Sequence, residues 1–249
     1  MSYKVALVTG AAAGIGAACA RRLSKDGVAI GVLDLDKERC AATVKSITDT
    51  GAKAMALGAD VSNRAQVFAA VEELREAFGP VTILVNNAGV TDFTPFEEIT
   101  DERWDFVYAV NVRGPMLCAQ AVLGDMKAAH WGRIVNISSS SAQTGAINMI
   151  TYSSSKGAVV TMTRSMAQEF GPLGITVNNI PPGSVMNTIM SEANRDRFQI
   201  PTEVLLQTIP VRRMGEPEDI ANACAWLCNE ASGYVTGQTI GVNGGRVVT

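Results

Sequence analysis

Tyr152 and Lys156 are the two side chains whose types and spacing could do acid–base chemistry. They lie four residues apart in Tyr152-Ser153-Ser154-Ser155-Lys156, a segment that predicts the start of a helix, so both fall on one helix face. The pKa of an isolated tyrosine is about 10, and an adjacent ammonium stabilises the phenolate. The pair therefore predicts a general acid/base. A plain exposed helix face is the alternative, because this spacing is common.

A run of serines precedes this pair at the end of a predicted strand. The strand Ile134–Ile137 is followed by Ser138-Ser139-Ser140-Ser141. Ligands of doubly wound sheets bind at the carboxyl ends of the strands, so a hydroxyl in this run could hold a substrate oxygen. Taken alone, the run is equally typical of a loop.

A glycine-rich turn follows the first predicted strand. Val5–Thr9 ends in the run TGAAAGIG, which spans Thr9–Gly16 and leads into a helix. Small residues let the backbone approach a pyrophosphate, and the helix N-terminus offers it unpaired N–H groups and a partial positive charge. The turn indicates a dinucleotide site, although a simple tight turn between strand and helix has the same composition.

A carboxylate directly follows the second predicted strand. Asp34 lies about 20 residues after the glycines, with Asp36 beside it. A carboxylate at this place accepts hydrogen bonds from both adenosine ribose hydroxyls and repels a 2′-phosphate. Ala12 and Ala13 supply no arginine within the turn that would compensate. We therefore expect NAD(H) in preference to NADP(H), with a helix-capping role for Asp34 as the alternative.

Apolar runs alternate with helical patterns, as a parallel sheet covered on both faces requires. The predicted strands are Val5–Thr9, Ala29–Leu33, Ala54–Leu57, Ile83–Val85, Ile134–Ile137 and Ile175–Ile180. The predicted helices are Ile15–Lys25, Lys37–Thr50, Ala65–Phe78, Glu102–Ala129 and Thr151–Phe170. Right-handed crossovers then predict a doubly wound, Rossmann-type α/β fold in a single domain over residues 1–249. A polar-rich stretch at about 186–209 breaks the alternation and is expected to form a substrate lid.

Length and charge disfavour several functional classes. With 249 residues, 47% of them hydrophobic, the chain can bury a core without disulfides. A net charge of −3 offers no basic surface for nucleic acid or an anionic membrane, and no run reaches the ~18 apolar residues of a membrane span. One histidine and five cysteines without a CxxC pair predict no metal site and reduced, mostly buried thiols. We expect a cytoplasmic protein, because no signal sequence is recognisable.

The sequence resembles the short-chain dehydrogenase/reductase family over nearly its whole length. The motifs that carry the resemblance are the TGxxxGIG turn, Asp60-Val61, Asn86-Asn87-Ala88-Gly89, Asn111, the set Ser139, Tyr152 and Lys156, and Pro182-Gly183. Ser139 lies 13 residues before Tyr152, which is the family's usual spacing and selects Ser139 from the serine run. The resemblance implies a nicotinamide cofactor and hydride transfer between an alcohol and a ketone.

The roles of individual residues follow from this resemblance. It implies that Tyr152 moves the proton of the alcohol oxygen, that Ser139 hydrogen-bonds this oxygen, and that Lys156 lowers the pKa of Tyr152 and binds the nicotinamide ribose. Asn111, the fourth catalytic residue, would hold a water that links Lys156 to solvent. The implied cofactor contacts are Gly10, Ala13, Gly14, Ile15, Gly16, Asp34, Leu35, Asp60, Val61, Asn87, Ala88, Gly89, Tyr152, Lys156, Pro182, Gly183, Val185 and Asn187.

The chain departs from the family pattern after the Pro-Gly pair. The family usually has a cofactor-binding Thr four residues after that glycine; here Asn187 stands in its place and Thr188 follows. An amide can both donate and accept, so Asn187 is expected to substitute for the threonine. The resemblance further implies that Asp60 contacts adenine and that the Val185 backbone contacts the carboxamide.

The candidate pocket residues are mostly apolar and flexible, which favours a small hydrophobic ketone or secondary alcohol as substrate. They are Ser140, Gln143, Ile147, Met149, Val90, Phe93, Met186, Ile189 and Met190. A 3-oxoacyl-[acyl-carrier-protein] reductase is the alternative, disfavoured by Asp34 and by the few basic residues available for docking an acidic carrier. A non-catalytic NADH-binding regulator is a further alternative, although it would not need Ser139, Tyr152 and Lys156 together. The resemblance also implies a homotetramer.

Overall fold

The structure, a computed structural model, describes residues 4–188 and 201–248. Its centre is a six-stranded parallel sheet in the order β3-β2-β1-β4-β5-β6. The strands are β1 (Val5–Thr9), β2 (Ala29–Asp34), β3 (Ala54–Gly58), β4 (Val81–Asn86), β5 (Gly132–Ile137) and β6 (Ile175–Ile180). All six predicted strands are present; β4 and β5 each begin two residues earlier than expected, because Thr82 in β4 and Gly132-Arg133 in β5 interrupt the apolar pattern.

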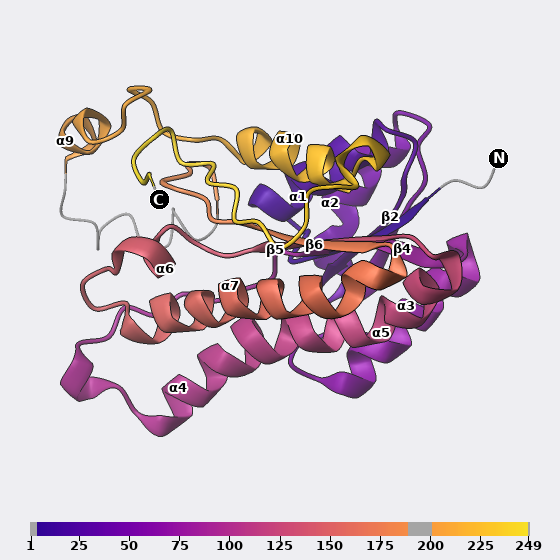
Figure 1. Cartoon of the computed structure of the whole chain (residues 1–249), viewed down its shortest axis with the longest axis horizontal. Coiled ribbons are helices and arrows are strands. Elements are labelled where there is room, and N and C mark those ends of the chain that lie inside the picture. The colour runs from indigo at the N-terminus through magenta and orange to yellow at the C-terminus, as the bar shows by residue number, and fades with distance from the viewer. Residues whose placement is uncertain (1–3, 189–200, 249) are drawn as a thin grey trace.

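Helices cover both faces of this sheet. They are α1 (Gly14–Ser24), α2 (Lys37–Thr48), α3 (Arg64–Phe78), α4 (Asp101–Tyr108), α5 (Gly114–Ala129), α6 (Ser141–Thr144), α7 (Ile150–Phe170), α9 (Thr202–Gln207) and α10 (Pro217–Cys228). Short 3₁₀ turns lie at Phe96–Glu98, Gly171–Leu173 and Glu230–Ser232. Figure 1 shows α1, α2 and α10 on one face and α3, α5 and α7 on the other. This is the doubly wound Rossmann-type arrangement that the sequence predicts.

Successive residues of the strands feed two separate cores. Val5 and Leu7 of β1 pack toward α3, α5 and α7, whereas Ala6 and Val8 pack toward α1, α2 and α10. Side chains alternate between the two faces of a sheet, so a strand covered on both sides must be apolar throughout. This double burial explains the near-continuous apolar runs in the sequence.

The loop after β2 is closed by Asp36 rather than by Asp34. The Asp36 carboxylate accepts a hydrogen bond from the Arg39 N–H at 2.9 Å and so caps the N-terminus of α2. Asp34 is the last residue of β2 and takes no part in this cap. The helix-capping alternative for Asp34 is therefore wrong, and the Asp34 side chain is available for another role.

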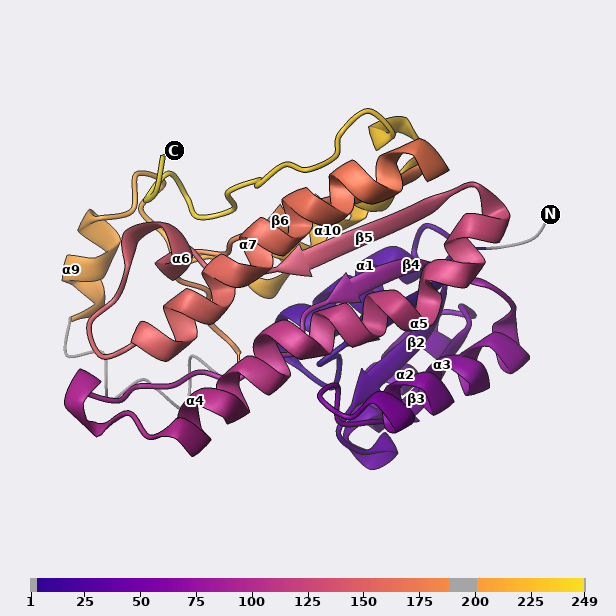
Figure 2. The ribbon, with the colours of Figure 1, turned by 60° about the horizontal axis from the view of Figure 1, so that its bottom comes forward.

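The long helix predicted over Glu102–Ala129 is interrupted. It consists of α4, one π-helical turn at Ala109–Arg113, and α5, which together run past α7 (Figure 2). A π-helical turn holds an extra residue and shifts the direction of the side chains around it. Within this turn, Asn111 is completely buried.

The same helical stretch, Asp101–Ala129, is long and apolar enough to cross a membrane by length and composition alone. Within its most apolar window, 56% of the residues are buried inside the protein. The stretch packs on β4 and β5, which accounts for its apolar residues as core residues of the sheet.

Candidate active site

The serine run and the start of α7 meet at the carboxyl end of β5. Ser139 follows β5 by two residues, Tyr152 lies in the first turn of α7, and Lys156 lies one turn further on. The Ser139 side chain lies close enough to the Tyr152 hydroxyl to influence its pKa. Tyr152 and Lys156 are 5% and 4% exposed, and the Lys156 Nζ lies 5.8 Å from the centroid of the Tyr152 ring. The structure thus brings together the three residues that the sequence selects, and the exposed-helix-face alternative is wrong.

Burial dominates the electrostatics of this cluster. It raises the pKa of Tyr152 above its ordinary value, and the Ser139 side chain offsets part of that rise. Burial also lowers the pKa of Lys156 to about 8. The expected lowering of the Tyr152 pKa by Lys156 is absent from this structure, in which burial and Ser139 account for the shift and the Lys156 Nζ donates to the Ile137 carbonyl at 3.0 Å. The phenol in this structure is a weaker acid than free tyrosine.

Asn111 holds the cluster in place from the π-helical turn. Its Nδ2 donates to the Val90 carbonyl at 2.9 Å and to the Ser155 Oγ at 3.0 Å, while its Oδ1 accepts from the Val90 N–H at 2.8 Å. The Ser155 hydroxyl in turn donates to the Tyr152 carbonyl at 2.7 Å. Both amide donors are therefore used within the protein, and Asn111 ties the loop after β4 to α7. The water that Asn111 is expected to hold stays a prediction.

Gly89 lets this loop approach the lysine. A Cβ at Gly89 would lie 3.1 Å from the Lys156 Nζ and 3.1 Å from the Asn111 Oδ1. Both contacts are tighter than ordinary van der Waals packing, so a side chain here would displace the lysine or the amide. The Asn-Asn-Ala-Gly segment after β4 thus forms one wall of the cluster.

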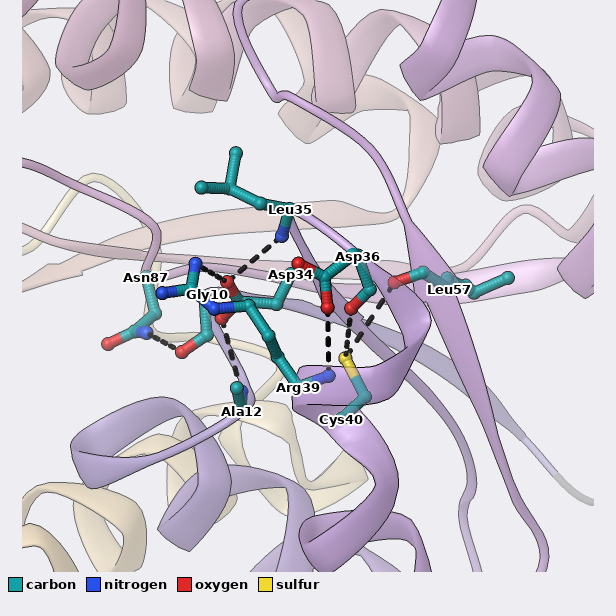
Figure 3. A network of polar contacts seen from close by, with 9 residues as sticks. All are labelled: Gly10, Ala12, Asp34, Leu35, Asp36, Arg39, Cys40, Leu57 and Asn87. Carbon is teal, nitrogen blue, oxygen red and sulfur yellow. Dashed lines mark hydrogen bonds and ion pairs between the residues drawn. The ribbon is translucent and has the colours of Figure 1, made fainter.

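The glycine-rich turn is fastened to the end of β4. The Thr9 hydroxyl accepts hydrogen bonds from the backbone N–H groups of Asn87 and Ala88 at 3.1 and 3.0 Å. The Asn87 Nδ2 donates to the Thr9 and Gly10 carbonyls, both at 3.0 Å (Figure 3). A Cβ at Gly10 would come within 2.8 Å of the Ala88 Cα, and one at Gly16 within 2.3 Å of the Gly10 carbonyl oxygen. Only glycine fits at these two places.

The N-terminus of α1 fits the pyrophosphate of a dinucleotide. Gly14 has φ +56°, a left-handed conformation that turns the chain into the helix. Ala13 offers no side-chain cap, and the first turn holds no acidic residue. The early N–H groups of α1, including those of Ile15 and Gly16, therefore lack the usual capping partner and present the positive end of the helix dipole. These features favour an anion, as the glycine pattern predicts.

Asp34 lies beside this turn and is held on both carboxylate oxygens (Figure 3). Its Oδ2 accepts from the Ala12 N–H at 3.3 Å, and its Oδ1 accepts from the Leu35 N–H at 2.9 Å. The Arg39 Nη1 also reaches Oδ1, at 3.3 Å. The Leu35 side chain is 61% exposed, so it leaves the surface next to Asp34 open.

Arg39 is the residue at this end of the site that the sequence analysis missed. The search for a cation near Asp34 considered only the glycine-rich turn. Arg39 is the third residue of α2, and that position lies close to the strand end from which the chain has just turned. A search extended to the first turn of the following helix would have found it.

Asp60 and Val61 lie after β3, next to the end of β2. The Asp60 Oδ1 accepts from both the N–H and the hydroxyl of Ser62, at 2.8 Å each, which fixes the carboxylate. Val61 is buried, and a Cβ on Gly114 of α5 would come within 2.9 Å of its Cγ2. The structure gives Val61 a packing role and leaves the adenine contact of Asp60 a prediction.

The segment after β6 passes over the same edge of the sheet. The Ser140 N–H donates to the Pro182 carbonyl at 3.0 Å, and the Gly183 N–H to the Val242 carbonyl at 3.2 Å. Ser184 and Met186 on either side of Val185 hydrogen-bond with Gly215, so the N–H and carbonyl of Val185 itself point away from Gly215. The contact of the Val185 backbone with the carboxamide stays a prediction.

Thr188, and not Asn187, faces the glycine-rich turn. Asn187 is exposed and has φ +58°, a left-handed conformation that turns its side chain away. A Cβ at Gly14 would lie 3.5 Å from both the Cβ and the Cγ2 of Thr188. Thr188 therefore lies at the glycine-rich turn, while the cofactor contact of Asn187 stays a prediction.

The candidate pocket residues divide into two groups. Met149 is buried beside Tyr152, and the loop that carries Phe93 is linked to the loop before α7 by the Thr94 N–H, which donates to the Asn148 carbonyl at 2.8 Å. Ile147, in contrast, is 90% exposed and lines no enclosed space in the described part of the chain. Ile189 and Met190, and with them half of the predicted lid, lie outside the described residues, whereas α9 at its far end is described.

A buried Tyr-Lys pair next to Ser139 and beside a dinucleotide-type turn, on a doubly wound sheet, is typical of an oxidoreductase. The family profile described as enoyl-(acyl carrier protein) reductase matches residues 10–246. The chain is 40% identical over 243 residues to the (2S)-[(R)-hydroxy(phenyl)methyl]succinyl-CoA dehydrogenase subunit BbsD of Thauera aromatica, covering 98% of this chain and 96% of that protein. It is 35% identical over 246 residues to the 3-oxoacyl-[acyl-carrier-protein] reductase FabG of Aquifex aeolicus, covering 97% and 96%.

A solved structure agrees with these matches. A protein assigned as a short-chain alcohol dehydrogenase from Sinorhizobium meliloti 1021 superposes with a TM-score of 0.93 at 33% identity, covering 99% of this chain and 97% of that one. The chain belongs to the short-chain dehydrogenase/reductase family.

Proposed function

We propose that the protein is an NAD(H)-dependent oxidoreductase that interconverts a hydrophobic secondary alcohol and its ketone, with Tyr152 as the general acid/base. The observation that carries this proposal is the burial of Tyr152 next to Lys156 at the carboxyl edge of the sheet, with the Ser139 side chain near enough to the phenol to influence its pKa. Burial excludes water from the phenol, and a positioned proton donor of this kind accelerates a reaction about 10²–10⁴-fold.

The residues of the chain transfer the proton, whereas the cofactor carries the hydride. When bound, the nicotinamide supplies a hydride to the ketone carbon in reduction and accepts one in oxidation. In reduction the Tyr152 hydroxyl gives its proton to the ketone oxygen, and the Ser139 hydroxyl hydrogen-bonds the same oxygen. Lys156, with its pKa lowered to about 8, exchanges protons close to neutral pH and is suited to restore the proton of Tyr152.

The raised pKa of Tyr152 sets the direction of the pH dependence. Reduction needs the protonated phenol, which a raised pKa preserves at neutral and mildly alkaline pH. Oxidation needs the phenolate, whose population grows as the pH rises. Oxidation is therefore expected to speed up with pH over the range in which reduction is unaffected.

NAD(H) is the proposed cofactor because of Asp34. Its carboxylate lies at the end of β2, held beside the glycine-rich turn by the Ala12 N–H. Ribose hydroxyls can donate to such a carboxylate, whereas a 2′-phosphate brings like charge to it.

The proposed substrate is a hydrophobic secondary alcohol. The buried Met149, three residues before Tyr152 at the start of α7, supports this choice, as does the name of the Thauera relative, which describes a dehydrogenase for an alcohol carbon that bears a phenyl group. Reduction of 3-oxoacyl groups on acyl carrier protein is the second candidate, favoured by the 35% identity to the Aquifex reductase.

We place the enzyme in the cytoplasm as a homotetramer that binds neither membranes nor nucleic acid. All five cysteines are unpaired and buried, which suits a reducing compartment.

A hollow on the face of α4, α5 and α7 is lined by Tyr108, Val112, Met116 and Met162, with Phe106 exposed nearby. An apolar face of this kind suits self-association. Light scattering after gel filtration tests it, and a monomer would refute the tetramer.

A panel of substrates tests the chemistry. The purified protein is assayed by absorbance at the NADH band with aryl ketones, cyclic ketones, small hydroxy acids and a 3-oxoacyl-carrier protein, each with NADH and NADPH. The proposal predicts the highest kcat/KM with NADH and a hydrophobic ketone. A carrier-bound substrate turned over as well as the free ketones would make the second candidate the function, and NADPH used as well as NADH would overturn the cofactor assignment.

A further inference from the structure

We propose that Arg39 is a specificity-determining residue of the dinucleotide site, which lets the site tolerate the 2′-phosphate that Asp34 alone would reject. The inference rests on the proposed function, because it assumes that the adenosine ribose binds at Asp34. It concerns a residue outside the glycine-rich turn, on the first turn of α2.

The position of Arg39 follows from the way the chain leaves β2. Asp36 caps α2 by accepting from the Arg39 N–H at 2.9 Å, which fixes the Arg39 backbone just past the end of the strand. From there the Arg39 Nη1 lies 3.3 Å from the Asp34 Oδ1 (Figure 3). Lys37, the other cation of this turn, pairs instead with Glu73 at 2.6 Å. A positive charge is thus directed to the one carboxylate that would select the ribose.

The pair with Arg39 limits what Asp34 can accept. A carboxylate oxygen has two acceptor positions, and Oδ1 uses one for the Leu35 N–H and one for Arg39. Two ribose hydroxyls that donate to Asp34 would therefore compete with Arg39 for Oδ1. Binding of NAD(H) requires the guanidinium to give way, so Arg39 weakens the selection that Asp34 makes.

The Arg39 guanidinium is exposed enough to bind a second anion in place of Asp34. The Arg39 side chain is 50% exposed, against 17% for that of Asp34, and an ion pair so exposed contributes ~0–1 kcal/mol to stability. Arginine offers a planar fork of donors that matches phosphate oxygens. A phosphate on the hydroxyl next to Asp34 would lie beside Arg39, which can leave the carboxylate and pair with the phosphate.

Fragments of the cofactor test this role without any turnover. Calorimetry measures the dissociation constants of 5′-AMP and adenosine 2′,5′-bisphosphate for the wild-type protein, R39A, R39K and K45A. Lys45 is the matched control, because it is an exposed cation of the same helix that pairs with Asp49, away from Asp34. The proposal predicts that R39A weakens the bisphosphate at least about tenfold. Binding of 5′-AMP should be unchanged or tighter, K45A should change neither, and R39K should fall between.

The outcomes separate this proposal from the function on which it rests. A ratio of the two dissociation constants that is the same in R39A and the wild type would overturn the role of Arg39 while leaving the dinucleotide site intact. Failure of the wild-type protein to bind either fragment would overturn both. A wild type that prefers the bisphosphate would contradict the NAD(H) assignment alone, and a fall of that preference in R39A would still support Arg39.

Discussion

The two ends of the site are built on different principles. At the reacting end, Tyr152 and Lys156 are almost fully buried. Their neighbours Asn111 and Ser155 hydrogen-bond with one another and with the backbone. At the adenosine end, Asp34 meets a half-exposed arginine in an ion pair open to water. Buried hydrogen bonds cost several kcal/mol when broken, whereas exposed ion pairs cost little. The chemistry is therefore fixed by the core, while the choice of cofactor is open to change by single surface residues.

Removal of the Tyr152 phenol oxygen is expected to have the largest effect on activity, and this effect should be confined to the reacting end. Tyr152→Phe keeps the ring that fills the space in α7 but removes the proton that reduction consumes. We predict a fall in kcat of about 10²–10⁴-fold with the dissociation constant of NADH within twofold of wild type. Stopped-flow turnover and fluorescence titration measure the two quantities. Turnover near the wild-type rate would show that another group delivers the proton.

A methyl group in the glycine-rich turn is expected to damage the adenosine end next most strongly. In Gly16→Ala the Cβ would lie 2.3 Å from the Gly10 carbonyl oxygen and 2.5 Å from the Asn87 Nδ2, so the turn must open. We predict NADH binding weakened more than tenfold, together with a lower melting temperature. Gly124→Ala is the control, since nothing lies within 4 Å of its Cβ in the middle of α5, and it should stabilise by ~0.5–1 kcal/mol. Equal behaviour of the two variants would refute the tight fit.

Loss of the buried Asn111 amide should lower the stability of the protein and impair the reacting end, while the adenosine end still binds its ligand. Asn111→Ala leaves the Val90 N–H and carbonyl and the Ser155 hydroxyl without their partner in the core. We predict a fall in the free energy of unfolding of about 3 kcal/mol by urea denaturation, with kcat reduced and the binding of 5′-AMP unaffected. Asn222→Ala, which removes only an exposed contact with Arg22, should change stability by less than about 0.5 kcal/mol. A cost for Asn111 as small as that for Asn222 would contradict the tie between loop and helix.

The buried Lys156 should produce the smallest of these effects, a dependence of the protein's stability on pH. The Lys156 pKa falls from 10.5 to about 8 on folding, so between these values the unfolded chain holds a proton that the native protein lacks. Stability from this group therefore rises with pH above 8, and its penalty is fully present below 8. From pH 8 to 9.5, wild type should gain about 2 kcal/mol relative to Lys156→Met, measured by denaturation at each pH. A stability difference that stays constant with pH would contradict the lowered pKa.

The sequence predicts most of the fold because the strands are covered on both faces. Their apolar runs and the intervening helical patterns identify all six strands and the doubly wound class without any knowledge of contacts. The pair Tyr152 and Lys156 is found from its spacing of one helical turn, whereas Ser139 is selected from the serine run by the resemblance to the family.

What the sequence could not supply depends on local backbone geometry and on burial. The π-helical turn that points Asn111 inward has no periodic pattern of its own. The left-handed conformation of Asn187 and the position of Thr188 beside Gly14 have no signal in the sequence. Helix spacing shows that Tyr152 and Lys156 are close together but not that they are buried. Burial shifts the pKa values of both residues against their charged forms, so the expected effect of Lys156 on the pKa of Tyr152 is not seen.

A crystal structure of the protein with NADH and an unreactive ketone analogue tests the central claim most directly. The account predicts the Tyr152 hydroxyl within hydrogen-bonding distance of the ketone oxygen, about 2.6–3.2 Å, with the Ser139 hydroxyl on the same atom and the nicotinamide facing the carbonyl carbon. A ketone oxygen bound by other groups, with the Tyr152 hydroxyl out of reach, would contradict it.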